Sequence, residues 1–152
     1  MQLSRFTDLG LRSLMRLAVS SGAEDRVTVK LIARQVNASE NYVAKAVSRL
    51  AELGYVESQR GRTGGIFLTE AGRKTTIGTI VRQLECDNEV IECGGDNPCP
   101  LSNACRLRGV LATAQKAFYA ELDRYLLSDL VDQRTVELLY MPVFPAASLI
   151  DT

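Results

Sequence analysis

Three evenly spaced cysteines mark a short segment that is unsuited to regular helix or strand. They are Cys93, Cys99 and Cys105, and two glycines and two prolines lie between them. Glycine and proline interrupt regular secondary structure, so we expect a loop in which the three thiols can converge. Thiolates favour iron–sulfur clusters, zinc or copper(I). The loop therefore predicts a metal centre.

The length and composition indicate a cytoplasmic protein. A chain of 152 residues suits one domain, or a small domain with an extension. The N-terminus is charged and lacks a long apolar run, and no stretch of 18 apolar residues occurs, so we expect neither a secretory signal nor a membrane span. In the cytoplasm thiols bind metals or react more often than they form disulfides, although four cysteines also allow two disulfides.

Charge is unevenly distributed along the chain, although the net charge is zero. Residues 1–80 contain 12 basic and 7 acidic residues, whereas residues 81–152 contain 6 and 11. A basic front half favours a polyanionic partner such as a nucleic acid.

Apolar residues recur at helical spacing three times within the first 53 residues, each time after a Thr or Ser that can cap a helix. We expect helices from Thr7 to about Ser20, from Val29 to Val36 after Thr28, and from Glu40 to Leu53 after Ser39.

A β-hairpin is expected next. Residues 55–60 alternate as in a strand, residues 61–65 are a basic, glycine-rich turn, and residues 66–69 form the second strand. A fourth helix, weakened by Gly72 and Gly78, is expected over 70–85. This order predicts a mainly α fold with a small β-hairpin wing: a winged helix-turn-helix.

Residues from Arg106 to about Leu126 are expected to form one long helix, roughly 30 Å in length. An apolar seam runs along it: Leu107, Val110, Leu111, Ala114, Ala117, Phe118, Leu122 and Tyr125. Such a stripe needs a partner surface, and a second copy of the chain gives a two-fold homodimer. The alternative is core packing within one subunit. A shorter helix from Ser128 to Tyr140 is expected to follow.

The third helix and the wing carry the candidate contacts to DNA. Asn and Lys or Arg side chains read base edges in the major groove, and arginine beside glycine reaches phosphate or the minor groove. The candidates are Lys30, Ser39, Asn41, Tyr42, Lys45, Ser48, Arg49, Arg60, Arg62 and Thr63. The alternative for Lys45 and Arg49 is a solvated helix face.

Three thiolates leave a four-coordinate metal centre one ligand short. The chain contains no histidine, so the remaining ligand is Cys86, a carboxylate, or an exogenous thiol or water. A structural zinc site usually has cysteines in pairs separated by two to four residues, which differs from the spacing here. Zinc and an unmetallated thiol sensor remain as alternatives.

The sequence resembles the Rrf-type winged-helix regulators, and among them the nitric-oxide-sensing repressors. The resemblance covers most of residues 1–127. It lies in residues 6–12, in the helix around 44–47, in the wing at 60–65 and in the cysteine loop, which closes with Cys105-Arg106-Leu107.

The resemblance implies a site. In that family the three loop cysteines hold an iron–sulfur cluster, 4Fe-4S in the intact form, with 2Fe-2S as the alternative. It also implies that Asp8 of the partner subunit is the fourth ligand, with Arg12 beside it. Cys86 lies outside the loop pattern, and we expect it to be a buried, inert thiol. Related regulators of cluster biogenesis use a histidine ligand, which this chain lacks.

The resemblance further implies a function. A homodimeric repressor would bind a palindromic operator in double-stranded DNA and be released when nitric oxide nitrosylates the cluster. A regulator that senses iron or cluster supply is the second hypothesis, and an iron–sulfur electron carrier the third. The chain has no dinucleotide or P-loop motif and no histidine base, so we expect no enzyme.

The expected division of the chain is therefore a DNA-binding domain (1–80), a cluster-binding loop region (81–105), a dimerisation helix (106–127), and a short helix with a tail (128–152).

Overall fold

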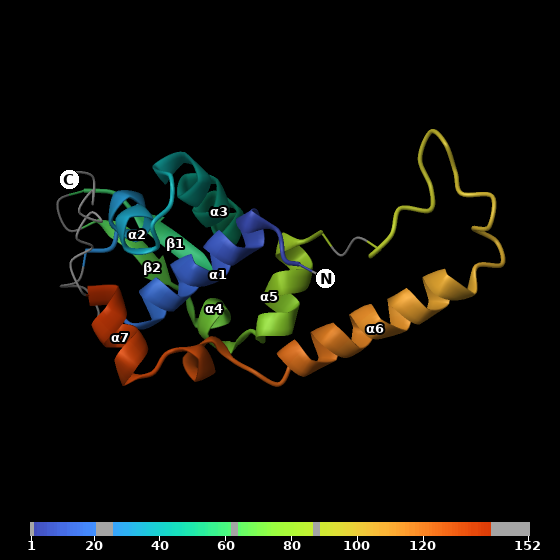
Figure 1. Cartoon of the computed structure of the whole chain (residues 1–152). Helices are drawn as coiled ribbons and strands as arrows, with labels where there is room; N and C mark the ends of the chain where they lie inside the picture. Colours follow the sequence, from blue (N-terminus) through green and yellow to red (C-terminus); the bar gives the residue numbers. More distant parts are fainter. Residues whose placement is uncertain (1, 21–25, 62–63, 87–88, 141–152) are drawn as a thin grey trace, which may run out of the picture.

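A computed structural model describes residues 2–20, 26–61, 64–86 and 89–140 (Figure 1). Its helices and strands, in chain order, are α1 (Arg5–Ala18), α2 (Val29–Gln35), α3 (Glu40–Glu52), β1 (Val56–Gln59), β2 (Gly65–Leu68), α4 (Glu70–Lys74), α5 (Ile77–Leu84), α6 (Arg106–Leu122), the 3₁₀ helix η1 (Leu127–Leu130) and α7 (Gln133–Tyr140).

The first three helices are close to those predicted, but α1 begins earlier. The hydroxyl of Ser4 accepts a hydrogen bond from the Thr7 backbone N–H at 3.2 Å, so Ser4 is the cap. Thr7 lies inside the helix and is fully buried, so the prediction that it caps the helix was wrong. Thr28 caps α2 by accepting from Leu31 N–H, as predicted. Ser39 occupies the N-cap position of α3, as predicted, but its side chain accepts no capping hydrogen bond from the described residues.

The core lies between α1, α2, α3 and α5. Its fully buried apolar side chains include Leu14, Ile32, Val43, Leu50 and Ile80. Burying each such side chain favours folding by about 1.5–3 kcal/mol relative to leaving it exposed. Packing one face of α3 on α1 leaves the opposite face of α3 outward, which fixes where a ligand can approach that helix.

The wing is an antiparallel pair of four-residue strands. Val56 pairs with Leu68 at its base, and Gln59 pairs with Gly65 near its tip. The backbone N–H of Ile66 also donates to Val27 O at 2.8 Å, which attaches β2 to the segment before α2. Helices α1–α3 and this hairpin form the predicted winged helix-turn-helix.

The helix predicted over residues 70–85 is two helices. The break lies at Thr75 and Thr76, which are both extended, and not at either glycine. Thr76 caps α5 by accepting from Thr79 N–H, and its hydroxyl donates to Asp123 Oδ1 at 2.7 Å. The break therefore lets the chain turn and meet the end of α6.

Gly78 allows α5 to pack closely against the C-terminal end of α6. A Cβ atom at this position would lie 2.4 Å from Asp123 Oδ1 and 2.6 Å from Tyr119 O, closer than any real contact allows. Arg82, one turn later on α5, donates to Asp123 Oδ2 at 2.7 Å, and its guanidinium lies 5.1 Å from the centre of the Tyr119 ring. These contacts fix α6 on α5.

The long helix is four residues shorter than predicted. It ends at Leu122 because the chain turns after Asp123: Ile77 N–H donates to Tyr125 O at 2.9 Å, and Leu126 forms a β-bridge with Thr76. Only its C-terminal part joins the core, where Tyr119 is 6% exposed and Phe118 and Leu122 pack beside it.

The rest of α6 extends away from the domain (Figure 1). Leu107 and Val110, near its N-terminus, are 59% and 64% exposed. The apolar seam is thus divided between an intramolecular contact and an open face.

After α6 the chain returns to α1. The single helix predicted over 128–140 is instead η1 followed by α7. Asp132 accepts from the N–H of Thr135 at 2.7 Å at the start of α7, and this separates the two helices. No helix in the described ranges is long and apolar enough to cross a membrane.

Candidate metal centre and DNA-binding surface

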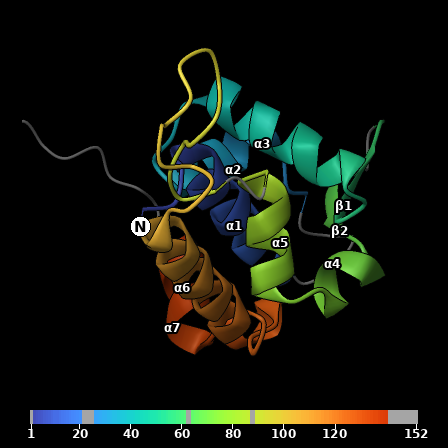
Figure 2. The same cartoon turned by 90° about the vertical axis from the view of Figure 1, so that its right-hand side faces the viewer.

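The cysteine loop lies at the far end of α6, apart from α1 and the wing (Figure 1). Figure 2 looks at the molecule from that end, so the loop is nearest the viewer. Asp8 is on α1 and the three thiols are on the loop, and Figure 1 shows these two segments apart in one chain.

The backbone folds the loop back on itself. Gly95 has a φ of 96°, a conformation that side chains disfavour, and this allows the chain to reverse after Cys93. The N–H of Cys99 then donates to Cys93 O at 3.2 Å. The N–H of Ser102 donates to Cys99 O at 3.1 Å, and Cys105 is the residue before α6. The predicted loop with three cysteines is therefore present.

All four cysteines are free thiols. Cys93 is buried, and Cys99 and Cys105 are partly exposed. Within the described ranges, no three Cys, Asp or Glu side chains are grouped closely enough to hold a metal ion. The donor chemistry still fits a thiolate-bound cluster, because one loop supplies three free thiols and one further ligand completes the set.

Cys86 differs from its prediction. It is exposed, whereas we expected a buried thiol. The residue follows the end of α5 and has a φ of 60°, so its side chain leaves the helix instead of continuing its buried face.

Asp8 and Arg12 lie together on α1. Arg12 Nε donates to Asp8 Oδ1 at 2.7 Å, and the two side chains are 52% and 44% exposed, respectively. The predicted proximity of Arg12 to Asp8 is thus present in one chain. Neither residue is buried in the core, so this carboxylate faces solvent.

Two contacts made by acidic side chains have no signal in the sequence. Glu85 Oε1 accepts from the Ser4 backbone N–H at 2.8 Å, which joins the start of α1 to the end of α5. Burial raises the pKa of Glu85, but hydrogen bonds from Thr7 and Ser4 outweigh this effect and lower it. Glu89 pairs with Arg108 on α6. No local pattern reveals such contacts, because the partners are 81 and 19 residues apart.

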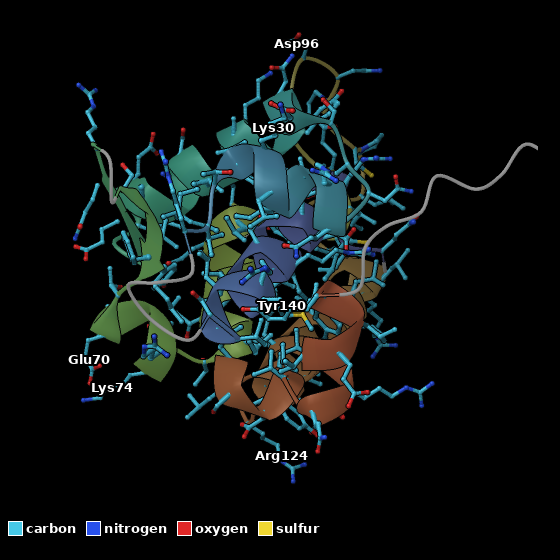
Figure 3. The ribbon with its side chains drawn as sticks, turned by 90° about the vertical axis from the view of Figure 1, so that its left-hand side faces the viewer. Lys30, Glu70, Lys74, Asp96, Arg124 and Tyr140 are labelled. Atoms are coloured by element: carbon cyan, nitrogen blue, oxygen red, sulfur yellow. The ribbon has the colours of Figure 1, made fainter. Side chains whose placement is uncertain are left out.

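The outer face of α3 is polar and accessible. Its exposed residues are Asn41, Tyr42, Lys45 and Ser48, while Val43, Ala46, Val47 and Leu50 on the other face are buried. Lys30 at the start of α2 and Ser39 before α3 are also exposed, and Lys30 stands out at the surface in Figure 3. The structure thus brings these candidates to the outer surface of the helix-turn-helix.

The remaining DNA candidates differ in their surroundings. Arg49 is partly exposed and forms an ion pair with Glu52 at 3.0 Å, so its guanidinium is already engaged. Arg60 is exposed at the end of β1. Arg62 and Thr63 lie outside the described residues.

Comparisons with known proteins agree with this architecture. A family model described as Rrf2, iron-dependent transcriptional regulator, matches residues 3–133. The chain is 51% identical over 131 residues to the HTH-type transcriptional repressor NsrR of Streptomyces coelicolor, covering 86% of this chain and 88% of that protein. It is 39% identical to the HTH-type transcriptional regulator NsrR of Geobacillus kaustophilus, covering 88% and 92%.

Solved structures show the same fold. The global cysteine regulator CymR of B. subtilis matches with a TM-score of 0.66 at 31% identity, covering 86% of this chain and 95% of that one. IscR of T. potens matches with a TM-score of 0.66 at 25% identity, covering 86% and 85%. These relatives are regulators, so this protein is a transcriptional regulator and not an enzyme. The chain belongs to the Rrf2 family of transcriptional regulators.

Proposed function

We propose that this protein is a homodimeric DNA-binding repressor that holds an iron–sulfur cluster on Cys93, Cys99 and Cys105 and responds to nitric oxide. The observation that carries the proposal is the loop of three free cysteines at the open end of α6, in a chain half identical to a repressor named NsrR. A 4Fe-4S cluster is the proposed form, with 2Fe-2S as the alternative.

The ligand set follows from donor chemistry. Three thiolates suit iron–sulfur ligation, and the chain has no histidine to complete the set. We assign the fourth position to Asp8 of the partner subunit. This assignment is supported by the exposure of Asp8 and by the separation of α1 from the loop within one chain. Cys86 is also exposed, and the Cys86→Ser variant tests whether Cys86 is the fourth ligand instead of Asp8.

The open face of α6 supports the dimer. Leu107 and Val110 there, and Leu101 in the loop, are each more than half exposed. A second copy that covers this face would remove apolar surface from water, which favours association by about 25 cal/mol per Å². A two-fold dimer also doubles the winged helix, so we expect a palindromic operator with one half-site for each α3.

The outer face of α3 supports DNA binding. Asn41, Lys45 and Ser48 lie on successive turns and present donors and acceptors to the major groove. Arg60 lies at the wing, where it can neutralise a phosphate. Arg62 and Thr63 are proposed as further wing contacts from the sequence alone.

A bound cluster would supply iron sites that react with nitric oxide. The chain's own residues convert that event into a change at the DNA. If Asp8 bridges to the partner's loop, its release frees α1, and α1 packs directly on α3. A coupling of about 1–3 kcal/mol between the two sites would change operator affinity about 5–150-fold.

The test compares matched cysteine variants of the dimer, purified without oxygen. We expect the wild type and Cys86→Ser to be brown, to contain iron and sulfide, and to bind operator DNA until nitric oxide is added. Cys99→Ser should be colourless and should not respond to nitric oxide. Affinities must be compared at one salt concentration. Zinc as the only stoichiometric metal in the wild type would refute the iron–sulfur cluster. Operator binding that is unchanged by nitric oxide would refute the response to nitric oxide.

A further inference from the structure

One ion pair joins the two arms of the cysteine loop. Arg108 Nε donates to Glu89 Oε2 at 2.9 Å, and Arg108 Nη2 donates to Glu89 Oε1. Glu89 comes four residues before Cys93, and Arg108 three residues after Cys105. The pair therefore closes the segment that contains all three loop thiols.

The arm that carries Glu89 runs along α6. Glu89, Val90 and Ile91 line one small cavity together with Arg108 and Leu111 of the helix. Cys93 follows this arm and is 9% exposed, although most of the loop around it is open to solvent. The buried thiol thus lies at the end of an arm that the ion pair links to the helix.

The ion pair also places the guanidinium between the two ends of the loop. Arg108 is one helical turn beyond Cys105, the residue before α6, and its partner Glu89 is four residues before Cys93. Hydrogen bonding to Glu89 and the charge of Glu89 raise the pKa of Arg108. No Lys or Arg occurs between Gln83 and Cys105, whereas five acidic residues do, so this charge comes from the helix and not from the loop.

We propose that Glu89 and Arg108 are positioning residues for the metal centre: the pair keeps the two arms of the loop together, and the guanidinium places a positive charge beside Cys93 and Cys105. The inference rests on the proposed function, because it concerns thiolates that hold a cluster. Closure of the loop should favour retention of the centre, whereas a cation beside those thiolates should raise its reduction potential, since net charge and solvent exposure both set that potential.

Four variants separate the two roles. Glu89→Gln removes the ion pair and keeps the positive charge. Arg108→Gln removes both. The double variant Glu89→Arg/Arg108→Glu restores the pair with its charges exchanged, so the loop should close while the charge beside the thiols is reversed. Arg124→Gln is the matched control: Arg124 lies just after α6 and forms an exposed pair with Glu121 near the end of that helix, far from Asp96 of the loop (Figure 3).

The first measurement uses the protein without its cluster. Hydrogen exchange at the backbone of residues 93–105 reports loop opening, because Cys99, Ser102 and Ala104 donate backbone hydrogen bonds there. The two side chains are 53% and 44% exposed, so solvent screens the pair and its effect on loop opening should be small. We expect Glu89→Gln and Arg108→Gln to speed exchange about two- to fivefold, and the double variant and Arg124→Gln to match the wild type.

The second measurement uses the anaerobically purified holoprotein. We expect Glu89→Gln and Arg108→Gln to release iron to a chelator faster than the wild type. The double variant should release iron at the wild-type rate but show a more negative reduction potential. Unchanged exchange in both single variants would overturn the positioning role. An unchanged potential in the double variant would overturn the charge role. A wild type without a cluster would refute the proposed function, while the exchange result would still decide whether the pair closes the loop.

Discussion

Arg12 donates a hydrogen bond from Nε to Oδ1 of Asp8, 2.7 Å away and one turn earlier on α1. Both side chains are about half exposed. An exposed pair at this helical spacing contributes only about 0.3–0.5 kcal/mol, so Asp8 can exchange Arg12 for a stronger partner at small cost. A carboxylate held by so weak a pair can leave Arg12 to bind a metal centre and can return to Arg12 when that bond is lost.

The first prediction concerns that exchange. We expect Asp8→Ala to keep the three cysteine ligands and to assemble a less stable cluster that is open to exogenous thiols. Its operator affinity should no longer differ appreciably with and without cluster, whereas the wild type should differ by about 5–150-fold. The measurement is operator binding of both forms at one fixed salt concentration.

Cys86→Ser is the control for this ligand, because Cys86 is also exposed and is the other candidate ligand. It should behave as the wild type. The reverse pattern, with loss of cluster in Cys86→Ser and wild-type behaviour in Asp8→Ala, would show that four cysteines of one subunit hold the cluster.

The second prediction concerns DNA reading. We expect Lys45→Ala to weaken operator binding by about 1–3 kcal/mol and to relax specificity at one position in each half-site. Arg60→Ala should weaken binding to all sequences and lower the slope of log affinity against log salt by about one unit.

Lys74→Ala provides the comparison for both substitutions. Lys74 is an exposed lysine paired with Glu70 on α4 (Figure 3), away from the outer face of α3. Its loss should leave operator binding unchanged. Wild-type binding by both Lys45→Ala and Arg60→Ala would remove these residues from the DNA-binding surface.

The third prediction concerns the open face of α6. Leu107 is 59% exposed in one chain, so Leu107→Glu should leave the fold intact and place a charge in the proposed dimer interface. We expect the dimer to dissociate at micromolar concentration, as measured by light scattering. Leu138→Glu alters a leucine of similar exposure, 61%, on α7 and should leave the dimer intact. A dimeric Leu107→Glu protein would place the interface elsewhere.

Local sequence signals predicted most of the fold. Helical periodicity and the threonine before α2 gave the helix-turn-helix, and strand alternation around a glycine-rich turn gave the wing, because these features depend on neighbours in sequence. The break at Thr75 and Thr76 was missed, since Thr76 bonds to Asp123, 47 residues away. Local helix propensity predicted a weak point at Gly72 and Gly78, whereas the break occurs where Thr76 makes its tertiary hydrogen bond to Asp123.

The candidate site was predicted less completely. The spacing of the cysteines identified the loop, and the polar positions of α3 identified its outer face. The pairing of Arg108 with Glu89 was not predictable, because neither residue carries a sequence pattern that selects the other. The burial of Cys86 was predicted wrongly for a related reason. The exposure of its side chain depends on the direction in which the chain leaves α5, and the hydrophobicity of the residue does not predict that direction.

The fourth prediction concerns how α7 is held. Tyr140 at the end of α7 lies beside α1 (Figure 3), and the Arg16 guanidinium is 4.6 Å from the centre of its ring. Arg16 is 1% exposed, and its Nε donates to Gln35 Oε1 at 2.6 Å. Tyr140 is 44% exposed whereas Arg16 is buried, so we expect Tyr140→Leu to lower the free energy of unfolding by about 1 kcal/mol through loss of the cation–π contact. Denaturant titration measures this change.

Tyr42→Leu is the matched control for that experiment. Tyr42 is 55% exposed on the outer face of α3, so its replacement should change stability by less than about 0.5 kcal/mol. Equal destabilisation by the two substitutions would show that the ring of Tyr140 has no special role in holding α7.

The last prediction concerns acid stability at the joint between α5 and α6. The hydrogen bond from Thr76 and then the one from Arg82 lower the pKa of Asp123. The folded-state pKa is thus below the unfolded value of about 3.9, so the carboxylate stabilises the folded protein above about pH 4 and loses this effect as pH falls through the folded pKa. Asp123→Asn should therefore be less stable than the wild type at pH 7, and the difference should shrink below about pH 4. Thermal unfolding of the cluster-free proteins at each pH tests this, with Asp96→Asn in the exposed loop as the charge-matched control. A stability difference that stays constant between pH 7 and the acid limit would show that the charge of Asp123 does not hold α6 on α5.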